Sequence, residues 1–190
     1  MRHKSYSRGH AVYRGQIQNR VSIEERAPIV NARKRLGDYE IDLMVGPKNR
    51  GAILTIIDRA SRFCLLEKLS SKSANEVSDT IIALLKSSSS PLFTITTDNG
   101  TEFAQHQKVA TNLNMNYYFA HPYASYERGS IENLNGLIRQ YIPKGTNFDD
   151  IDEKYVKILQ EKLNKRPRKV LGFLSPKEYT NKIEVSQLDL

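Results

Sequence analysis

The segment at residues 38–45, DYEIDLMV, alternates between two kinds of position along its whole length. Tyrosine, isoleucine, leucine and valine occupy one alternating set, and three carboxylates and a methionine occupy the other. A period of two predicts a β-strand with one apolar and one more polar face. Two further apolar segments follow after short turns, AILTIIDR at 52–59 and RFCLLEKL at 62–69. Three consecutive strands with tight connections predict an antiparallel meander.

The period of the pattern then changes. In residues 73–87, apolar side chains recur at i, i+4, i+7 and i+8, which is the spacing of one helix face. Ser73 at the start of this segment and Glu76 three residues later predict a capping box. The chain beyond it alternates between the two periods and ends in a segment at 166–179 that we expect to be irregular. Strands are expected at 92–98 and 115–123, and helices at 101–114, 129–142 and 151–165.

This order of elements predicts an α/β fold with a mixed five-stranded sheet, three strands antiparallel and then two parallel, flanked by helices. A helix that crosses between consecutive strands favours parallel pairing. We expect a core at residues 36–180, a basic N-terminal arm or linker at 1–35 and a C-terminal tail at 181–190. Within the arm, we expect residues 1–20 to be extended or disordered and residues 21–35 to hold a short helix or linker.

Positive charge is concentrated at the start of the chain. The 190 residues carry a formal net charge of +8, and residues 1–35 contribute nine basic and two acidic side chains. A basic arm indicates a polyanion such as nucleic acid as partner, and a solvated tail is the alternative. A second basic segment, KLNKRPRK at 162–169, favours nucleic acid.

Several protein classes are disfavoured by what the sequence lacks. No apolar run is long enough to span a membrane, and the basic start is not followed by the apolar stretch of a secretory signal. The single cysteine, Cys64, cannot form an intrachain disulfide and fits a reducing compartment. A small-molecule phosphotransfer protein is a weaker alternative, because no glycine-rich phosphate loop, zinc-binding spacing or nucleophile-elbow motif is present.

Three carboxylates stand at positions from which they can converge. Asp42 lies on the more polar face of the first strand, Asp98 ends the fourth strand in TITTDNGTEF, and Glu132 lies early in the helix after the fifth strand. If the first and fourth strands are neighbours, Asp42 and Asp98 meet, and the helix carries Glu132 over them. For Asp98, the alternative is an ordinary Asp-Asn-Gly turn.

The helix of Glu132 presents this acid together with Asn135 and Arg139 on its polar face. An amphipathic helix with a solvated polar face is the alternative. Clustered carboxylates are costly unless a cation lies between them, and Mg²⁺ prefers such oxygen ligands. We expect the three acids to have no positive side chain as partner in their motifs, so that divalent cations are required.

Each of the three acids has a neighbouring acid that we expect to lie outside the site. Glu40 is about 7 Å back along the first strand. Glu102 lies beyond the turn that follows the fourth strand, and Glu127 precedes the helix proper. The direction of Glu127 is therefore not set by the apolar face of the helix.

Seven segments form a recognisable series: RGQIQNRVSI, GDYEID, TITTDNGTEFAQH, YFAHPY, ERGSIENLNGLIRQYIPKG, LNKRPRK and LGFLSPKEY. In this order they resemble the catalytic half of bacterial insertion-sequence transposases of the IS-thirty family, which share the retroviral-integrase type of ribonuclease-H-like fold. The resemblance covers roughly residues 14–180, and the 33 residues between Asp98 and Glu132 suit the family. The chain departs from the family at Tyr39, where tryptophan is usual, and at His121, where an acid is common.

The resemblance implies that Asp42, Asp98 and Glu132 form a catalytic triad that holds two Mg²⁺ or Mn²⁺ ions. It implies metal-dependent cleavage and transfer of DNA strands by transesterification. The implied partners are double-stranded DNA, as transposon ends and target, and further copies of the chain in a homo-oligomer. The implied location is the bacterial cytoplasm, at the nucleoid and not at a membrane. The residues expected to bind DNA lie on the helix face and in the second basic segment: Asn135, Arg139, Lys165, Arg166, Arg168 and Lys169.

Members of the IS-thirty family carry helix-turn-helix segments ahead of this core. Nothing before residue 36 is long or apolar enough to be one, so we expect a core fragment. One alternative function is an inactive core that acts only as a DNA-binding or assembly module. Another is a structure-selective nuclease of the same fold that hydrolyses DNA without joining it.

Overall fold

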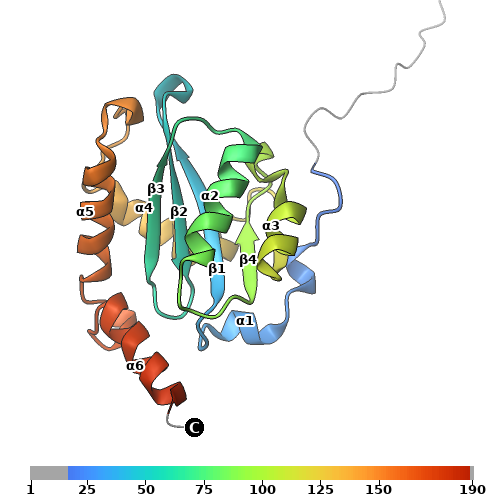
Figure 1. Ribbon diagram of the computed structural model, residues 1–190, viewed down its shortest axis with the longest axis vertical. Helices are drawn as coiled ribbons and strands as arrows, with labels where there is room; N and C mark the ends of the chain where they lie inside the picture. Colours follow the sequence, from blue (N-terminus) through green and yellow to red (C-terminus); the bar gives the residue numbers. More distant parts are fainter. Residues whose placement is uncertain (1–16, 189–190) are drawn as a thin grey trace, which may run out of the picture.

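A mixed five-stranded sheet forms the centre of the computed structural model, which describes residues 17–188 (Figure 1). The strands are β1 (Asp38–Val45), β2 (Ala52–Asp58), β3 (Cys64–Leu69), β4 (Thr94–Thr97) and β5 (Asn116–Phe119). They lie in the order β3-β2-β1-β4-β5. β2 pairs antiparallel with β1 and β3, whereas β4 pairs parallel with β1 and β5. The predicted α/β fold is confirmed, with the first and fourth strands as neighbours.

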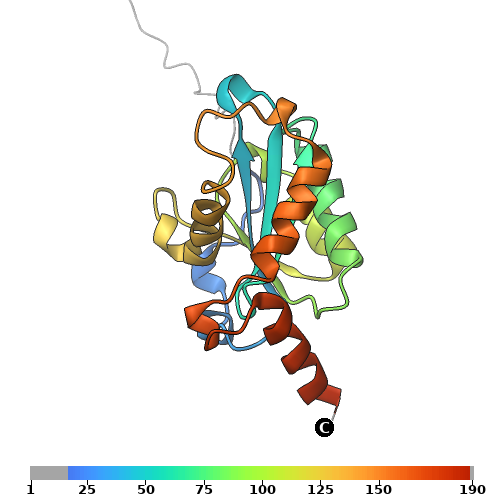
Figure 2. The same cartoon turned by 90° about the vertical axis from the view of Figure 1, so that its left-hand side faces the viewer.

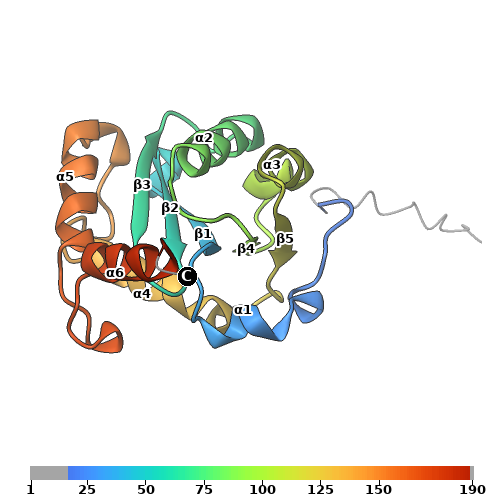
Figure 3. The same ribbon diagram turned by 60° about the horizontal axis from the view of Figure 1, so that its bottom comes forward.

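Helices cover both faces of this sheet (Figure 3). They are α1 (Pro28–Ala32), α2 (Ala74–Lys86), α3 (His106–Leu113), α4 (Gly129–Ile138), α5 (Glu153–Asn164) and α6 (Pro176–Leu188). Short 3₁₀ turns lie at η1 (Ile23–Glu25), η2 (Pro47–Asn49), η3 (Thr101–Phe103), η4 (Ser125–Arg128), η5 (Phe148–Asp150) and η6 (Lys169–Leu171). Among the described residues, no helix has the length and apolar character that crossing a membrane would require.

The alternation along β1 assigns its side chains to two separate cores. Tyr39, Ile41 and Leu43 pack with apolar side chains of α2 and α3 on one face of the sheet. Met44 packs on the other face, with apolar side chains of α4 and α5. Because side chains alternate along a strand, the carboxylates of β1 lie on the α4 side of the sheet.

The helix α5 closes the outer edge of β3 with side chains, and Figure 2 views the molecule from this side. The amide of Asn164 accepts from the backbone N–H of Cys64 and donates to its carbonyl, each at 2.8 Å. Gln160 Oε1 accepts from the N–H of Leu66 at 2.7 Å, and Lys157 Nζ donates to the Leu66 carbonyl at 3.0 Å. These residues recur three and four positions apart on one helix face, so α5 satisfies backbone groups that the edge strand leaves unpaired.

The N-terminal segment packs on the sheet from residue 17 onwards. Ser22 forms a parallel bridge with Phe119 of β5, and Val30 of α1 is fully buried. The short helix expected in this region is confirmed as α1. Residues 17–35 therefore belong to the packed fold and not to a free arm. The extended or disordered start that the sequence predicts falls mainly on residues 1–16, which lie outside the described residues.

Two helices differ from their expected bounds. The helix expected at 101–114 is divided into η3 and α3, because the 3₁₀ turn carries Phe103 into the core beside α2. The helix expected at 129–142 ends at Ile138. Pro143 follows shortly afterwards, and proline disfavours helical geometry in the residue that precedes it.

The segment expected to be irregular at 166–179 contains the start of α6, which continues through the expected core boundary at residue 180. Ser175 Oγ accepts from the N–H of Glu178 at 3.3 Å, and the Glu178 carboxylate accepts from the N–H of Ser175 at 2.8 Å. These reciprocal bonds form a complete capping box, with Pro176 at the first helical position. The sequence SPKE carries this cap, although α6 has little amphipathic periodicity.

The cap predicted for α2 is confirmed in one of its two bonds. Ser73 Oγ accepts from the N–H of Glu76 at 3.3 Å. The Glu76 carboxylate accepts instead from the N–H groups of Ser70 and Ser71, at 2.8 and 2.9 Å. The acid therefore orders the connection between β3 and α2 as well as the start of the helix.

Candidate active site

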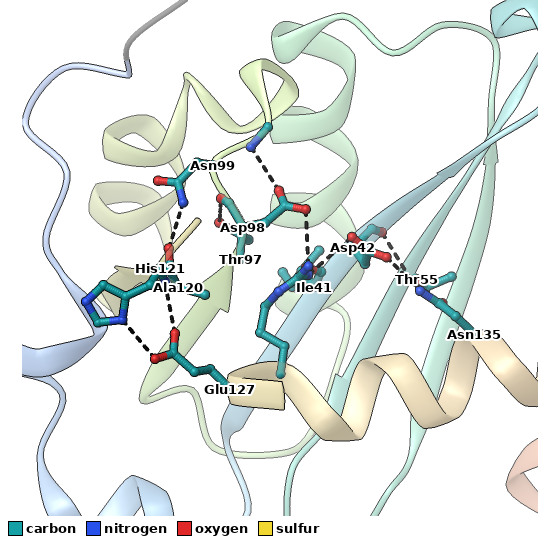
Figure 4. A network of polar contacts seen from close by, with 12 residues as sticks. Ile41, Asp42, Thr55, Thr97, Asp98, Asn99, Ala120, His121, Glu127 and Asn135 are labelled. Atoms are coloured by element: carbon teal, nitrogen blue, oxygen red, sulfur yellow. Dashed lines mark hydrogen bonds and ion pairs between the residues drawn. The ribbon is translucent and has the colours of Figure 1, made fainter. Parts of the chain in front are cut away.

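Asp42 and Asp98 lie beside each other because of the parallel register between β1 and β4. Glu40 of β1 pairs with Thr96 of β4. Because the two strands are parallel, the positions two residues further along each segment, Asp42 and Asp98, lie opposite each other. Asp98 directly follows the last residue of β4, at the carboxyl end of the strand. Figure 4 shows the two carboxylates turned toward each other. The predicted convergence of these two acids is therefore present in the fold.

The Asp-Asn-Gly turn and the site coexist at Asp98. Asp98 Oδ1 accepts from the N–H of Gly100 at 2.9 Å, which is ordinary turn chemistry. The other carboxylate oxygen, Oδ2, lies 3.1 Å from Nη2 of Arg128. Asn99 donates to the carbonyl of Ala120 at 2.6 Å and so fixes the turn against the residue after β5. One side chain therefore serves both the turn and the acid pair.

A guanidinium group bridges the two carboxylates, contrary to the expectation that their motifs hold no positive partner. Arg128 is the last residue of η4, immediately before α4. Its Nη1 lies 3.2 Å from Asp42 Oδ1, and its Nη2 lies 3.1 Å from Asp98 Oδ2. The side chain of Arg128 is only 10% exposed, against 21% for Asp42 and 40% for Asp98. Packing of η4 over the strand ends creates this contact, which the motif ERGSIEN alone does not reveal.

Asn135 fixes the second oxygen of Asp42. Its Nδ2 donates to Asp42 Oδ2 at 2.6 Å. The hydroxyl of Thr55, opposite Asp42 in β2, lies 3.2 Å from Asn135 Oδ1 and 3.1 Å from the Asp42 carbonyl. The amide of Asn135, a residue that the resemblance assigns to a DNA-contacting helix face, bonds to the acid in this structure. Thr55 was not identified from the sequence, since only the strand register brings it to the site.

Burial makes the Asp42 carboxylate costly in its charged form. Desolvation raises the pKa of Asp42, Arg128 opposes this shift, and the charge of Asp98 adds to it. The hydrogen bonds from Arg128 and Asn135 also favour the ionised form. A partly desolvated carboxylate pair that needs a positive charge between its members is suited chemically to hold a cation.

Glu132 lies in α4 between two residues whose side chains contact Asp42, Arg128 just before the helix and Asn135 within it. Arg128, Glu132 and Asn135 follow one another at i, i+4 and i+7, which places them on one helix face. The Glu132 side chain is exposed. Within residues 17–188, no three His, Cys, Asp or Glu side chains are close enough together to hold a metal ion. The structure therefore brings Asp42 and Asp98 together and leaves Glu132 on the adjoining helix face.

Glu40 anchors the start of α4 to the sheet. The Glu40 side chain is fully buried, and its Oε1 accepts from Arg59 Nε at 2.9 Å. Its Oε2 accepts from the N–H of Ile131 at 2.8 Å, one residue before Glu132. Arg59 also donates to the carbonyl of Val30 at 2.6 Å. The sequence predicts correctly that Glu40 stands apart from the acid pair, but not that it positions the helix of Glu132.

The other two neighbouring acids lie outside the acid pair. Glu102 is in η3, beyond the turn. Glu127 accepts from the backbone N–H of His121 at 2.9 Å and lies 2.8 Å from His121 Nδ1. The hydrogen bond with Glu127 raises the pKa of His121. His121 thus forms an ion pair at the position where the IS-thirty family often has an acid.

The basic residues that the sequence assigns to DNA are distributed around the ends of α4 and α5. Arg139 Nη1 lies 3.3 Å from the Pro143 carbonyl, and its guanidinium lies 5.4 Å from the centre of the Phe148 ring. Lys165 Nζ lies 3.6 Å from Glu161, and Arg166 donates to Gln140 at 3.1 Å. Arg168 donates to the Leu163 carbonyl at 3.1 Å, and Lys169 is exposed at the start of η6.

Comparison with known proteins agrees with this architecture. The family described as "Integrase core domain" matches residues 32–125. The transposase for insertion sequence element IS4351 of Bacteroides fragilis is 49% identical over 165 residues, which are 87% of this chain and 51% of the relative. The transposase InsI for insertion sequence element IS30A of Escherichia coli (strain K12) is 37% identical over 163 residues, 85% of this chain and 42% of the relative.

The solved structures show the same fold. The crystal structure of the catalytic core domain of BIV integrase superposes with a TM-score of 0.59 at 18% identity, over 79% of this chain and 97% of that one. The sheet order and its helical layers therefore have the ribonuclease-H-like fold of that domain. Residues 32–125 belong to the integrase core domain family, and most of the chain is similar to transposases of insertion sequences. It spans about half the length of the curated relatives it matches.

Proposed function

We propose that this chain is the catalytic core of a DNA transposase, which cleaves and transfers DNA strands by transesterification. The observation that carries the proposal is the carboxylate pair at the carboxyl edge of the sheet, built around a positive charge. Asp42 and Asp98 converge from two strands, and the cation between them is the side chain of Arg128. Ligands of α/β sheets gather at this edge, so the pair is accessible to a substrate there.

The donor set fits a divalent cation. Asp42 and Asp98 would hold it, and Glu132 would join them from the face of α4 that already carries Arg128 and Asn135. A bound Mg²⁺ or Mn²⁺ pair would supply an activated water or 3′-hydroxyl and stabilise the leaving oxygen in phosphoryl transfer. Asn135 holds Asp42 in one orientation.

The substrate we propose is double-stranded DNA, both as transposon ends and as target. The net charge of +8 supports a polyanionic partner. A homo-oligomer acting in the bacterial cytoplasm would bring two DNA ends together. The alternative function, a core that binds DNA or assembles subunits without chemistry, is favoured by one observation. Among the described residues Glu132 does not join the acid pair in a three-acid cluster.

Strand transfer of a pre-cut DNA end, in the presence of Mg²⁺ or Mn²⁺, distinguishes the two functions. Asp42→Asn, Asp98→Asn and Glu132→Gln should each abolish joining while DNA binding persists, because the amide keeps the shape and removes the charge. Glu102→Gln and Glu127→Gln are the matched controls, since both remove an acid outside the pair. Joining by the unmodified chain that continues undiminished with all divalent cations chelated would refute the metal mechanism. If Glu132→Gln joined normally, the assignment of the third acid would be wrong.

A further inference from the structure

A cavity rich in arginine lies on α4, around the helix from the acid pair. It has a volume of about 260 Å³ and is lined by Arg33, Arg62 and Arg168 together with Gly129 and Asn133 of α4. Its arginines come from three distant segments: the end of α1, the turn between β2 and β3, and the chain after α5. Figures 2 and 3 both show α1 beside α4 on this side of the sheet.

The charges in this cavity have no acid among the residues that line it. Two buried arginines elsewhere in the fold are balanced, since Arg59 pairs with Glu40 and Arg128 with the acid pair. A third, Arg26, donates to the neutral side chains of Thr96 and Asn31. Within residues 17–188, none of the three cavity arginines forms an ion pair with a carboxylate. The cavity therefore gathers three positive charges without a directly paired carboxylate, and the charges of Glu40 and Asp58 act on Arg62 only from outside the cavity lining.

Two of the arginines are held in place and still have N–H groups to offer. Arg62 donates to Ser130 Oγ at the start of α4. Arg168 donates through Nη2 to the Leu163 carbonyl, while its Nε is buried without a hydrogen-bond partner among the described residues. Burial lowers the pKa of Arg62, and the charge of Arg33 lowers it further. An anion in the cavity would relieve this repulsion and accept the remaining donors.

The rest of the lining indicates which anion fits. Ile57, Leu134, Leu137 and Val170 contribute apolar side chains to the same cavity, and Val170 is 72% exposed. Forked guanidinium groups match the oxygens of a phosphate, and an apolar wall matches a deoxyribose. Asn133 follows Glu132 directly, so the cavity lies about 100° around α4 from the candidate third acid. A DNA strand that passes the acid pair can continue around α4 to this cavity.

We propose that the cavity between Arg33, Arg62 and Arg168 binds one backbone phosphate of DNA, as a subsite separate from the acid pair. This inference rests on the proposed function for its choice of DNA. The chemistry itself is recognition of a phosphate, which a free phosphate ion shares. The role is to hold the strand in register, because a phosphate contact positions DNA without reading its sequence.

The phosphate subsite is tested with Arg33→Gln, Arg168→Gln and the double variant Arg33→Gln/Arg168→Gln. A second double variant, Arg33→Lys/Arg168→Lys, keeps the positive charge at both positions. Arg33 makes no side-chain hydrogen bond to the described residues, so we expect its replacement to leave the fold intact. Arg50→Gln is the matched control, because Arg50 is exposed at the opposite end of β2. Circular dichroism and the melting temperature in chloride establish that each variant is folded.

The first measurement is the melting temperature in inorganic phosphate against chloride at equal ionic strength. The second is the salt dependence of duplex DNA affinity, in chelator so that no chemistry occurs. Phosphate should stabilise the unmodified chain and the Arg50→Gln control but not the double variant. The loss of one phosphate contact should reduce the slope of log affinity against log salt by about 0.9. Between 50 and 200 mM salt, the unmodified chain should then lose about 3.5-fold more affinity than the double variant.

Each outcome decides the proposal. A reduced slope in the double variant that the lysine variant restores supports a DNA phosphate. Stabilisation by phosphate with an unchanged DNA slope would mean that the cavity holds free phosphate only, and the proposal would be overturned. An unchanged slope without stabilisation would overturn it as well. Because both measurements are made without chemistry, a chain that binds in this way but never joins strands would refute the proposed function and leave the subsite standing.

Discussion

The substitution Glu40→Gln tests how α4, the helix of Glu132, is held on the sheet. Glu40 is fully buried and accepts from both Arg59 and the N–H of Ile131. A glutamine keeps an oxygen that can accept from Ile131. It loses the negative charge and leaves the Arg59 guanidinium, itself 2% exposed, without a counter-charge.

Breaking a buried ion pair by removing one partner costs about 3–5 kcal/mol. Because glutamine retains one of the two hydrogen bonds, we expect the lower end, a loss of about 3 kcal/mol in the free energy of unfolding. For a chain of this length each kcal/mol lowers the melting temperature by about 2–4 °C, so the variant should melt about 6–12 °C earlier. Strand transfer far below that temperature should decline much less than in Asp42→Asn, since Glu40 lies outside the acid pair.

Calorimetry and urea unfolding measure this loss, with Glu67→Gln as the matched control. Glu67 also lies on a strand and pairs with a lysine, Lys157 at 2.5 Å, but both side chains are partly exposed. Such a pair is worth about 0–1 kcal/mol. The double variant Glu40→Gln/Arg59→Met leaves no buried charge, so its loss should be at least about 1 kcal/mol smaller than the sum of the single losses. If Glu40→Gln unfolded no more easily than Glu67→Gln, the anchoring role would be refuted.

Three other expected outcomes follow from the contacts of the site and of the last helix. Arg128→Gln removes the cation between the two carboxylates, so in chelator the free energy of unfolding should fall by about 2 kcal/mol, measured in urea; no change would contradict the bridge. The raised pKa of His121 means that its ion pair stabilises the fold below the ordinary histidine pKa of about 6.5 and is lost as pH rises through the higher folded value. The melting temperature should therefore fall over this interval in the unmodified chain but not in His121→Gln, and equal profiles would exclude the pair. Ser175→Ala should cost about 1 kcal/mol through the cap of α6, and unchanged helical content and stability would argue against that cap.

The sheet could be predicted from the sequence because each strand carries its own pattern. The bounds of β1 follow directly from the alternation in DYEIDLMV, and that alternation also places Asp42 on the α4 side. The sequence left open whether β4 lies beside β1, and the structure supplies that pairing and its register. From that register, the approach of Asp42 and Asp98 follows without any knowledge of side-chain packing.

The contacts of the site could not be predicted, because they join residues whose proximity depends on packing. Arg128 reaches both acids only when η4 folds across the strand ends. Glu40 accepts a hydrogen bond from the N–H of Ile131, which lies 91 positions later in the sequence. No local sequence pattern predicts a contact between residues so far apart in the chain. The helix α6 is a different case, since the capping sequence SPKE is present in a segment that the prediction leaves irregular.

The side chains with which α5 covers β3 have a consequence for how copies of this protein can meet. An uncovered edge strand offers its N–H and carbonyl groups to any passing chain and is a common starting point for aggregation. Here Asn164, Gln160 and Lys157 occupy those groups along Cys64 and Leu66. Two molecules cannot merge their sheets across β3 while α5 is docked, so self-association through this edge would first require that helix to detach. Any contact between copies must therefore use other surfaces, and the chain is protected from fibril-like stacking at the β3 edge of its sheet.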